Sequence, residues 1–446
     1  MVNPNQARKK AKISIADFLI TLSIVATPIL GALTLIIAFY LTFYSLVVFF
    51  KVRCFRGQEN YPFKLLGMIF ISYFIYFLLN GLVFEDNVSE LKRVVQKITP
   101  ILIIGILALT TQEHTFSLNH KFIGFLSMWS LCITFSLATL IYVINPKFGF
   151  MGHTLASKAN VFDRLEMGTH NPLIFAVIST TLSFLCLLSF EQKTFFEKIT
   201  SLIILVICIV SIFFWNGSRG PLLVCLPLSV ISVWYLQPNI FHFYNQTNKK
   251  IFWAISASII LFSLTCIYLN AESISQNESL VYLLNGISSI FNTANYDFSI
   301  SHRKVLWVSS LEALPLRPIF GYGISHKIDA VLPFIENTSN FHTDFLDYNH
   351  LHSIYLNHLI SGGTFGFLIL ILYLSSVIFV IKKSNLKTSR DTKYFIMIVL
   401  TSLMLNGLTN VILMHELLSH FFSMLLLLIL ICIKNHPKHI SSGPQG

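Results

Sequence analysis

The sequence predicts an all-α polytopic membrane protein, and two observations support this fold class. First, 54% of the 446 residues are hydrophobic and only 11% are charged, whereas about a quarter of the residues in a soluble domain are charged. Second, apolar runs of about 17 to 25 residues, the length that crosses a bilayer as a helix, recur through the whole chain. Because no soluble module separates these runs, we expect residues 1–446 to form a single integral membrane domain.

About twelve apolar runs qualify as transmembrane helices when they are read between polar breaks. The weakest break is "TPILG", which separates the first two runs. The predicted spans are 14–30, 32–50, 63–84, 96–111, 122–145, 171–190, 199–216, 220–236, 251–270, 363–381, 394–411 and 417–433. Twelve spans place both termini on the same side of the membrane.

The position of the charges predicts which side each loop faces. Loops on the side of the termini hold 20 Lys and Arg and 5 Asp and Glu, whereas loops on the other side hold 11 and 13. Because basic loops stay in the cytoplasm, both termini are expected to be cytoplasmic. Topology therefore explains the net charge of +11, and nucleic-acid binding is excluded.

This topology leaves one large outer loop, residues 271–362. A smaller outer loop covers residues 146–170, and "WNGSRGPL" forms a tight outer turn. A loop of about 90 residues is long enough to contain short helices, and loops of this length are usually functional. The outer side is therefore where we look for chemistry.

Arg219 lies in the tight turn, within "NGSRGP". A guanidinium cannot be neutralised, so at a membrane edge it needs an anionic or carbonyl partner. The neighbouring Ser218 and Gly220 would let a ligand approach closely. The alternative is an arginine that extends to the membrane surface and only sets topology, although the outer end of a span is not where such an arginine helps.

Arg303 and Lys304 open "SHRKVLWVSSLEAL" in the large loop. Trp307, Leu311 and Leu314 follow at positions i, i+4 and i+7, which predicts an amphipathic helix lying against membrane or protein. With Ser301 as the cap, both cations would fall in the first turn, a favourable place for a phosphate. The alternative is a solvated charge pair at an exposed helix end. Downstream, "PIFGYG" is expected to end the helix and turn the chain.

Histidines gather just before the tenth span, in "YNHLHSIYLNHLISGGTFG". A histidine with a pKa near the ambient pH is a good general base, so His350 and His352 are candidates. Metal binding and a purely structural role are the alternatives for the pair, although no Cys, Asp or Glu stands at a zinc-ligand spacing from them. For His358 we favour a structural role.

Two further polar clusters lie on the same outer side. "DRLEMGTHNP" contains Arg164, which is either a third arginine of the site or a loop charge paired with its acidic neighbours. "MHELLSHFF" contains His415 and His420, whose roles stay open. Two guanidiniums and a base on one face match transfer from a pyrophosphate leaving group without a metal.

The motifs resemble those of the O-antigen ligase and polymerase superfamily of bacterial envelope glycosyltransferases. His352, Gly363 and Gly366 match its pattern of a histidine, an apolar stretch and GxxG before a span. "SRGPLL" and "RKVLWVSSLEALPLRPIFGYG" resemble its two arginine motifs, and "GTHNP" resembles its Asn-Pro element. "RGQENYPFK" and the "HLHS" doublet are closer to enterobacterial O-antigen ligases. One departure is Ser353 where an asparagine is usual, with Asn349 before the doublet, so the choice between the two imidazoles stays open and we favour His352.

The resemblance implies a ligase of the bacterial inner membrane that transfers O-antigen polysaccharide from undecaprenyl pyrophosphate to the lipid A–core oligosaccharide at the periplasmic face. His352 would accept the proton of the attacking hydroxyl, while Arg219 and Arg303 would neutralise the departing pyrophosphate. Direct displacement would invert the anomeric centre and needs no metal or other cofactor. Further candidates for substrate contacts are His350, Asn349, Arg164 and Lys304. Grooves between the helices would hold the lipid tails of donor and acceptor.

Other functions stay open at this point. An O-antigen polymerase uses the same kind of donor with another lipid-linked repeat unit as acceptor, and a protein O-glycosyltransferase is related. A transporter or flippase for a lipid-linked sugar belongs to a different class. It would place its key charges near the bilayer midplane, whereas Arg219, Arg303 and His352 are expected at one surface.

Overall fold

The computed structural model describes nine continuous segments of the chain and isolated positions between residues 20 and 40. The segments are 61–85, 88–110, 120–144, 172–212, 219–246, 298–336, 350–383, 389–410 and 412–434. All regular structure in these segments is helical. The α-helices are α3 (Tyr61–Phe84), α4 (Val88–Thr110), α5 (His120–Ile144), α6 (Pro172–Leu185), α7 (Phe195–Ser211), α8 (Arg219–Gln246), α12 (Phe298–Ala313), α13 (Lys327–Glu336), α15 (Ile354–Lys383), α16 (Arg390–Thr409) and α17 (Glu416–Lys434). Short 3-10 helices are η3 (Phe190–Gln192), η5 (Leu314–Leu316) and η6 (Ile412–Met414).

Several of these helices are long and apolar enough to cross a membrane. Five qualify within the described residues: Lys64–Phe84, His120–Leu137, Gly220–Gln237, Ile354–Val380 and Arg390–Thr409. Leu173–Leu185 and Leu417–Leu430 are shorter apolar helices. The predicted all-α membrane fold is confirmed at this level. The count of twelve spans stays a prediction, because span 251–270 lies outside the described residues and spans 14–30 and 32–50 are described at isolated positions only.

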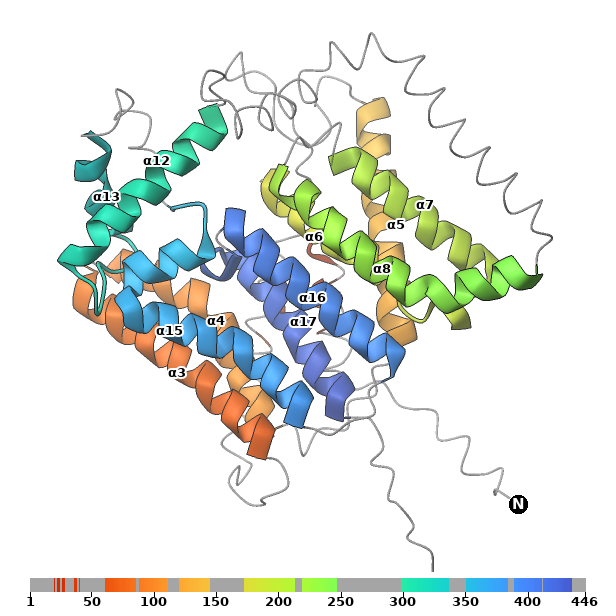
Figure 1. Cartoon of the computed structure of the whole chain (residues 1–446), viewed down its shortest axis with the longest axis horizontal. Coiled ribbons are helices and arrows are strands. Elements are labelled where there is room, and N and C mark those ends of the chain that lie inside the picture. The colour runs from red at the N-terminus through yellow and green to blue at the C-terminus, as the bar shows by residue number, and fades with distance from the viewer. Residues whose placement is uncertain are drawn as a thin grey trace, which may run out of the picture.

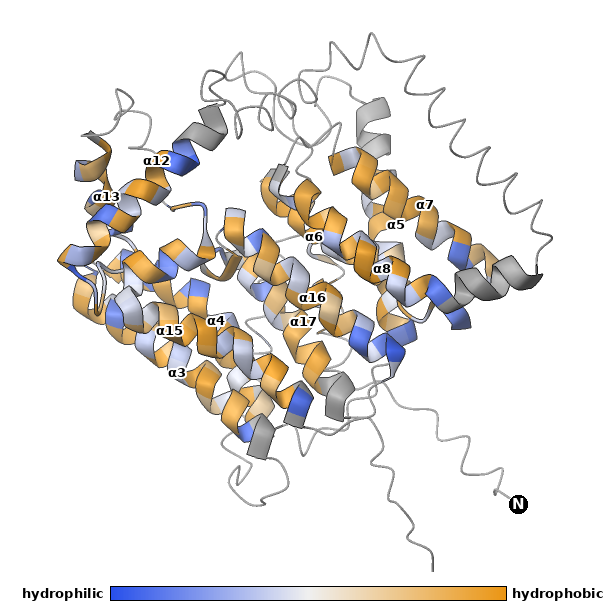
Figure 2. Ribbon diagram, in the orientation of Figure 1, coloured by the Kyte–Doolittle hydropathy of each residue, from blue (hydrophilic) through white to orange (hydrophobic). Residues whose placement is uncertain are grey.

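The helices pack as two groups joined at the centre (Figure 1). α15 lies on α3, α3 on α4, and α4 on α17, while α16 joins α17 to α8 and α6 joins α5 to α7 and α8. Most of these helices are apolar over their length, whereas polar residues interrupt α12 and α13 (Figure 2). One buried apolar cluster extends through the helices, and a smaller one lies under α12 and α13, with Leu306, Val331, Leu351 and Ile360 at its centre.

Ends of helices far apart in sequence meet at one end of the molecule, which we call the site end. The Ser419 hydroxyl at the start of α17 donates to the Lys97 carbonyl of α4 at 3.0 Å. The Ser325 N–H, just before α13, donates to Glu85 at the end of α3 at 2.9 Å. Gly220 at the start of α8 lies so close to the end of α16 that an added Cβ would be 2.4 Å from Thr409 Oγ1. These contacts join loops that the charge pattern assigned to a single side of the membrane.

The opposite end is held by polar contacts between loops. Asp391 at the start of α16 accepts hydrogen bonds from Ser189 at 2.7 Å and from Tyr235 of α8 at 2.5 Å. The Arg390 guanidinium lies over the Trp234 ring, 5.3 Å from its centroid. α7 begins with a capping box in which Thr194 and Glu197 satisfy each other's backbone N–H groups. These contacts fix α6, α8 and α16 relative to one another.

α15 is kinked at Gly363, where the backbone has φ 61° and ψ −160°. The segment after α12 lies against this kink. Tyr322 N–H donates to the Ile360 carbonyl at 2.9 Å, and Thr364 N–H donates to the Pro318 carbonyl at 2.7 Å. The two glycine-rich stretches singled out in the sequence are therefore hydrogen-bonded to each other, backbone to backbone. This pairing fixes the large loop to the start of a span.

The kink at Gly363 yields a prediction about stability. A Cβ at this position would lie 2.3 Å from the Ile319 carbonyl oxygen, on a residue that already has a positive φ. We expect Gly363→Ala to lower the free energy of unfolding by about 2–4 kcal/mol, a range typical of backbone strain combined with overpacking. Thermal unfolding in detergent measures it. Gly81→Ala is the control, because its nearest atom is the side-chain Leu91 Cδ1 at 3.2 Å. Equal melting temperatures for the two variants would contradict the prediction.

The predicted start of the amphipathic helix is wrong. α12 begins at Phe298, so Ser301 lies inside the helix and Arg303 lies in its second turn. No Gly or Pro separates Phe298 from Arg303, so nothing stops the helix from extending upstream. The proposed phosphate site at a helix N-terminus is therefore not formed by Arg303 and Lys304.

The buried face of α12 also differs from the predicted stripe. His302, Leu306, Ser309 and Ala313 are buried, whereas Leu311, which was expected on the apolar face, is 55% exposed. Trp307 lies at the edge of the buried face and packs against the smaller core cluster. α12 therefore turns His302 and its neighbour Arg303 toward the protein.

Candidate functional site

The turn before α15 has an unusual backbone. His352 has φ 51°, the left-handed region that costs a non-glycine residue about 1–2 kcal/mol. Two hydrogen bonds hold the preceding residue in place. Trp307 Nε1 of α12 donates to the Leu351 carbonyl at 3.1 Å, and Leu351 N–H donates to Asn357 Oδ1 at 3.4 Å. Strain maintained by its surroundings is common at functional sites, and it points to His352.

The residues after His352 are structural. Ser353, which stands where an asparagine is usual in the superfamily, caps the helix by accepting from Leu356 N–H at 3.5 Å. His358 is fully buried, with Nδ1 2.6 Å from the Ile354 carbonyl oxygen and Nε2 2.5 Å from the Tyr73 hydroxyl. The prediction that His358 is structural is confirmed.

His350 and His352 form a compact pair, with ring centroids 4.3 Å apart and planes nearly perpendicular. Burial lowers the pKa of His352 well below its usual range, and the charges of His350, Arg303 and His302 act in the same direction. Burial lowers the pKa of His350 to about 4, with the charges of Lys327, His415 and Lys97 adding to the effect. Both imidazoles are therefore neutral at neutral pH, the form in which an imidazole accepts a proton.

Arg303 is half-buried on α12 and lies close enough to His352 for its charge to lower the pKa of that imidazole. Lys304 is exposed on the same helix. Among the described residues, the charges that act on His352 are those of His350, Arg303 and His302, and Lys304 is not one of them. The structure thus brings Arg303, His350 and His352 together.

The remaining predicted residues are placed only in part. Arg219 is the first residue of α8, and its neighbour Gly220 packs against the end of α16, so the backbone of Arg219 lies at the site end. The side chain of Arg219 lies outside the described part of the chain, as do Arg164 and Asn349.

Three cationic or titratable residues at the site were not singled out in the sequence, Lys97, His302 and Lys327, and they are joined by His415, whose role was left open. The positive charge of Lys97 on α4 lowers the pKa of His350, His415 and Lys327. Burial lowers the pKa of Lys327 to about 7, an effect that Lys97 strengthens and Glu85 opposes. Lys97 had a sequence signal, because a lysine inside an apolar run needs a polar partner or a water-filled site.

The imidazoles of His350 and His415 each have a ring nitrogen that makes no hydrogen bond to another described residue. Within the described residues, Nδ1 of His350 and Nδ1 of His415 are buried and have no hydrogen-bond partner. A buried polar atom without a partner costs about 1–3 kcal/mol. A polar ligand bound between α4, α13 and the turn before α15 would remove this cost.

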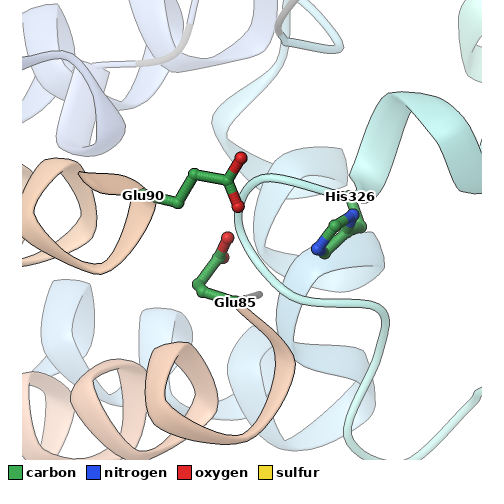
Figure 3. A group of neighbouring side chains, drawn as sticks. All are labelled: Glu85, Glu90 and His326. Atoms are coloured by element: carbon green, nitrogen blue, oxygen red, sulfur yellow. The ribbon is translucent and has the colours of Figure 1, made fainter. Parts of the chain in front are cut away.

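A group of possible metal ligands lies beside the cations. Glu85, Glu90 and His326 offer ligand atoms within 4.8 Å of one another, from the junction of α3 and α4 and from the segment before α13 (Figure 3). Glu85 already interacts with protein groups. The Ser325 N–H donates to Glu85 Oε1 at 2.9 Å, and the charge of Glu85 raises the pKa of Lys327. We therefore interpret Glu85 as a counter-charge to Lys327.

The assembled site has the groups needed for transfer of an anionic leaving group. It contains two neutral imidazoles, one arginine within range of them, and two lysines from separate elements. This set can accept a proton and neutralise phosphate charge in a partly dry environment. Lys97 lies within α4, whereas the other members lie at helix ends or on α12 and α13.

Comparison with known protein families supports the resemblance described above. Residues 203–371 match the family described as O-antigen ligase. The matched segment contains Arg219, Arg303, the histidine pair and the kinked start of α15, and it confirms the resemblance to the O-antigen ligase superfamily. It covers fewer than half of the residues and leaves out α4 and α17. No curated protein matches the chain.

Proposed function

We propose that the chain is an O-antigen ligase. It transfers O-antigen polysaccharide from undecaprenyl pyrophosphate to the lipid A–core oligosaccharide at the periplasmic face of the inner membrane. The observation that carries the proposal is the compact His350–His352 pair, with Arg303 of α12 close enough for its charge to lower the pKa of His352, within a segment that matches the ligase family.

In the proposed reaction, His352 accepts the proton of the acceptor hydroxyl as its oxygen attacks the anomeric carbon. The bond from that carbon to the pyrophosphate oxygen breaks, and undecaprenyl pyrophosphate departs with the electron pair. Arg219 and Arg303 neutralise the charge that grows on this leaving group. A single displacement inverts the anomeric centre, and its chemistry asks for no metal or nucleotide sugar.

The lowered pKa of His352 fits this role once the donor is bound. A base with a very low pKa is weak, since general-base catalysis is best when the pKa lies near the working pH. The positive charge of Arg303 lowers the pKa of His352, and a bound pyrophosphate would offset that charge. The donor would thus raise the pKa of the base that takes the proton of the acceptor hydroxyl, while the larger effect of burial stays in place.

The proposed orientation places the site end in the periplasm. Lys193, Lys198, Arg390 and Lys393 lie at the opposite end of the helices, next to the contacts of Asp391. Basic residues favour the cytoplasmic side. Arg303, His350 and His352 lie outside the candidate membrane spans, not at a bilayer midplane. A transporter for a lipid-linked sugar therefore has little support.

A strain that lacks its own ligase tests the proposal. Complementation with the chain should restore the ladder of O-antigen bands on lipopolysaccharide. The alternative, an O-antigen polymerase, would instead lengthen the repeats on the undecaprenyl carrier and leave the ladder of the ligase-deficient strain absent. A polymerase-deficient strain makes a core that carries a single repeat unit. If the chain converts this product to a full ladder, the chain is a polymerase.

Lys97 is expected to contribute to this reaction although it lies far from His352 in sequence. Replacing it with methionine removes the charge that faces His350, His415 and Lys327, and the transfer rate should fall by about tenfold, the value of one charge-assisted hydrogen bond. Transfer by purified protein measures it. Lys92→Met is the matched control, because Lys92 is exposed on α4. Equal rates for the two variants would remove Lys97 from the site.

A further inference from the structure

A cleft opens between the end of α3 and the segment from Arg317 to Ala330. Its volume is about 460 Å³, and it is lined by Phe84, Arg317, Tyr322, His326 and Asp329 among others. Small-molecule sites commonly measure about 300–1,000 Å³. One lining residue, His326, also belongs to the group of Glu85, Glu90 and His326 (Figure 3). None of the residues predicted from the sequence to act in transfer lines the cleft.

The Arg317 guanidinium is held in position by two aromatic rings. It lies 5.7 Å from the centroid of the Phe84 ring and 5.3 Å from that of Tyr322. The Tyr322 hydroxyl in turn donates to the Ala313 carbonyl at 2.8 Å. A guanidinium held near aromatic rings keeps N–H groups that can donate to a phosphate or carboxylate oxygen.

Apolar side chains continue from this cleft onto the outer surface of the helices. Leu316 and Phe320 are 70% and 57% exposed, and the Phe320 ring stacks on Phe365 of α15 at 5.6 Å. Val83 at the end of α3 is 73% exposed, and Leu368 of α15 is 50% exposed. Both α3 and α15 are long enough to span a membrane. Exposed apolar side chains therefore lie beside the cleft and on two helices that are long enough to span a membrane.

The charges in the cleft favour a sugar over a pyrophosphate. Asp329 is exposed and lies 3.5 Å from the His326 ring, and Glu85 and Glu90 lie beyond it. Carboxylates accept hydrogen bonds from sugar hydroxyls but repel a pyrophosphate. Arg317 adds one cation at the outer edge, which matches a single phosphate group near the bilayer surface.

We propose that this cleft binds the sugar headgroup of an acylated, phosphorylated glycolipid, with its phosphate at Arg317 and its acyl chains along α3 and α15. The inference rests on the proposed function, in which such a glycolipid is the acceptor. His326 is followed in the chain by Lys327, whose charge acts on His350, and His350 lies against His352. A headgroup in the cleft would thus lie next to a residue of the transfer site, while the pyrophosphate donor binds elsewhere.

Lipid retention by the full-length protein tests the proposal. Native mass spectrometry of the detergent-purified protein would be run with two probes: a hexa-acylated monophosphoryl lipid A, and undecaprenyl pyrophosphate. Arg317→Gln should weaken retention of the lipid A probe about tenfold, the loss of one charged hydrogen-bond partner. It should leave undecaprenyl pyrophosphate unchanged. Lys92→Gln is the matched control, since it removes an exposed cation from α4.

The outcomes separate this proposal from the proposed function. If Arg317→Gln instead weakens retention of undecaprenyl pyrophosphate, the cleft belongs to the donor. If wild type and Arg317→Gln retain each probe equally well, Arg317 takes no part in lipid binding. A dephosphorylated lipid A probe should be retained equally by wild type and Arg317→Gln, and a tenfold difference there would overturn the phosphate contact. Because binding is read without turnover, a chain that retains lipid A through Arg317 but transfers no O-antigen would contradict the ligase and not the cleft.

Discussion

His352→Ala is expected to abolish O-antigen attachment to the lipid A–core and to lower the transfer rate by about 10²–10⁴-fold, the usual contribution of a general base. The imidazole is neutral, strained at φ 51° and packed against His350. Its removal leaves no group at the same place to take the proton of the attacking hydroxyl. The lipopolysaccharide ladder of a complemented ligase-deficient strain and transfer by the purified protein measure the two effects.

The control for this prediction is a histidine at the opposite end of the helices. His120 is close to Thr392, with Nε2 3.2 Å from its hydroxyl, and His120→Ala should keep its activity. His350→Ala should retain more activity than His352→Ala, because His350 acts on the base and not on the substrate proton. The reverse order would assign the base to His350.

The pH dependence gives a second measurement of the same residue. The base must be neutral, so kcat/KM falls as the pH drops through the pKa of His352 in the free enzyme. Burial and three neighbouring charges lower that pKa, so the acidic limb of kcat/KM should lie below pH 6.5. An acidic limb at or above pH 6.5 would show that another group acts as the base.

Local sequence patterns predicted much of the fold. The third span was expected at 63–84 and α3 covers Tyr61–Phe84, while the eleventh was expected at 394–411 and α16 covers Arg390–Thr409. Such spans depend on hydrophobicity alone, which is a property of the segment itself. The start of α12 was missed because a serine before two cations resembles a cap, and a helix start depends on what lies upstream.

The candidate site was only partly predictable because its other members are brought together by packing between distant segments. Lys97 is placed beside His415 because α17 packs on α4, and no local pattern indicates that contact. The glycines before the tenth span were read as a family motif. Their physical role, a close backbone contact between Gly363 and the Ile319 carbonyl, becomes visible only when the loop and the span are seen together.

Arg303→Gln is expected to lower the transfer rate by about 10²–10³-fold, the usual cost of removing one group that stabilises charge in a transition state. The leaving pyrophosphate gains negative charge as the glycosidic bond breaks, and Arg303 is the cation on α12 that acts on His352. Arg303→Lys should recover only part of the rate, because an ammonium cannot make the bidentate contact of a guanidinium. Glu312→Gln, an exposed position on the same helix, controls for folding of α12.

A shift in the pH profile distinguishes this role from a purely structural one. The positive charge of Arg303 lowers the pKa of His352, so Arg303→Gln should raise that pKa and move the acidic limb of kcat/KM to higher pH. Loss of rate with an unchanged limb would mean that Arg303 acts on the leaving group without facing the base. An unchanged rate and an unchanged limb in a folded variant would place Arg303 outside the site, because a cation that faces both the base and the pyrophosphate must alter at least one of them.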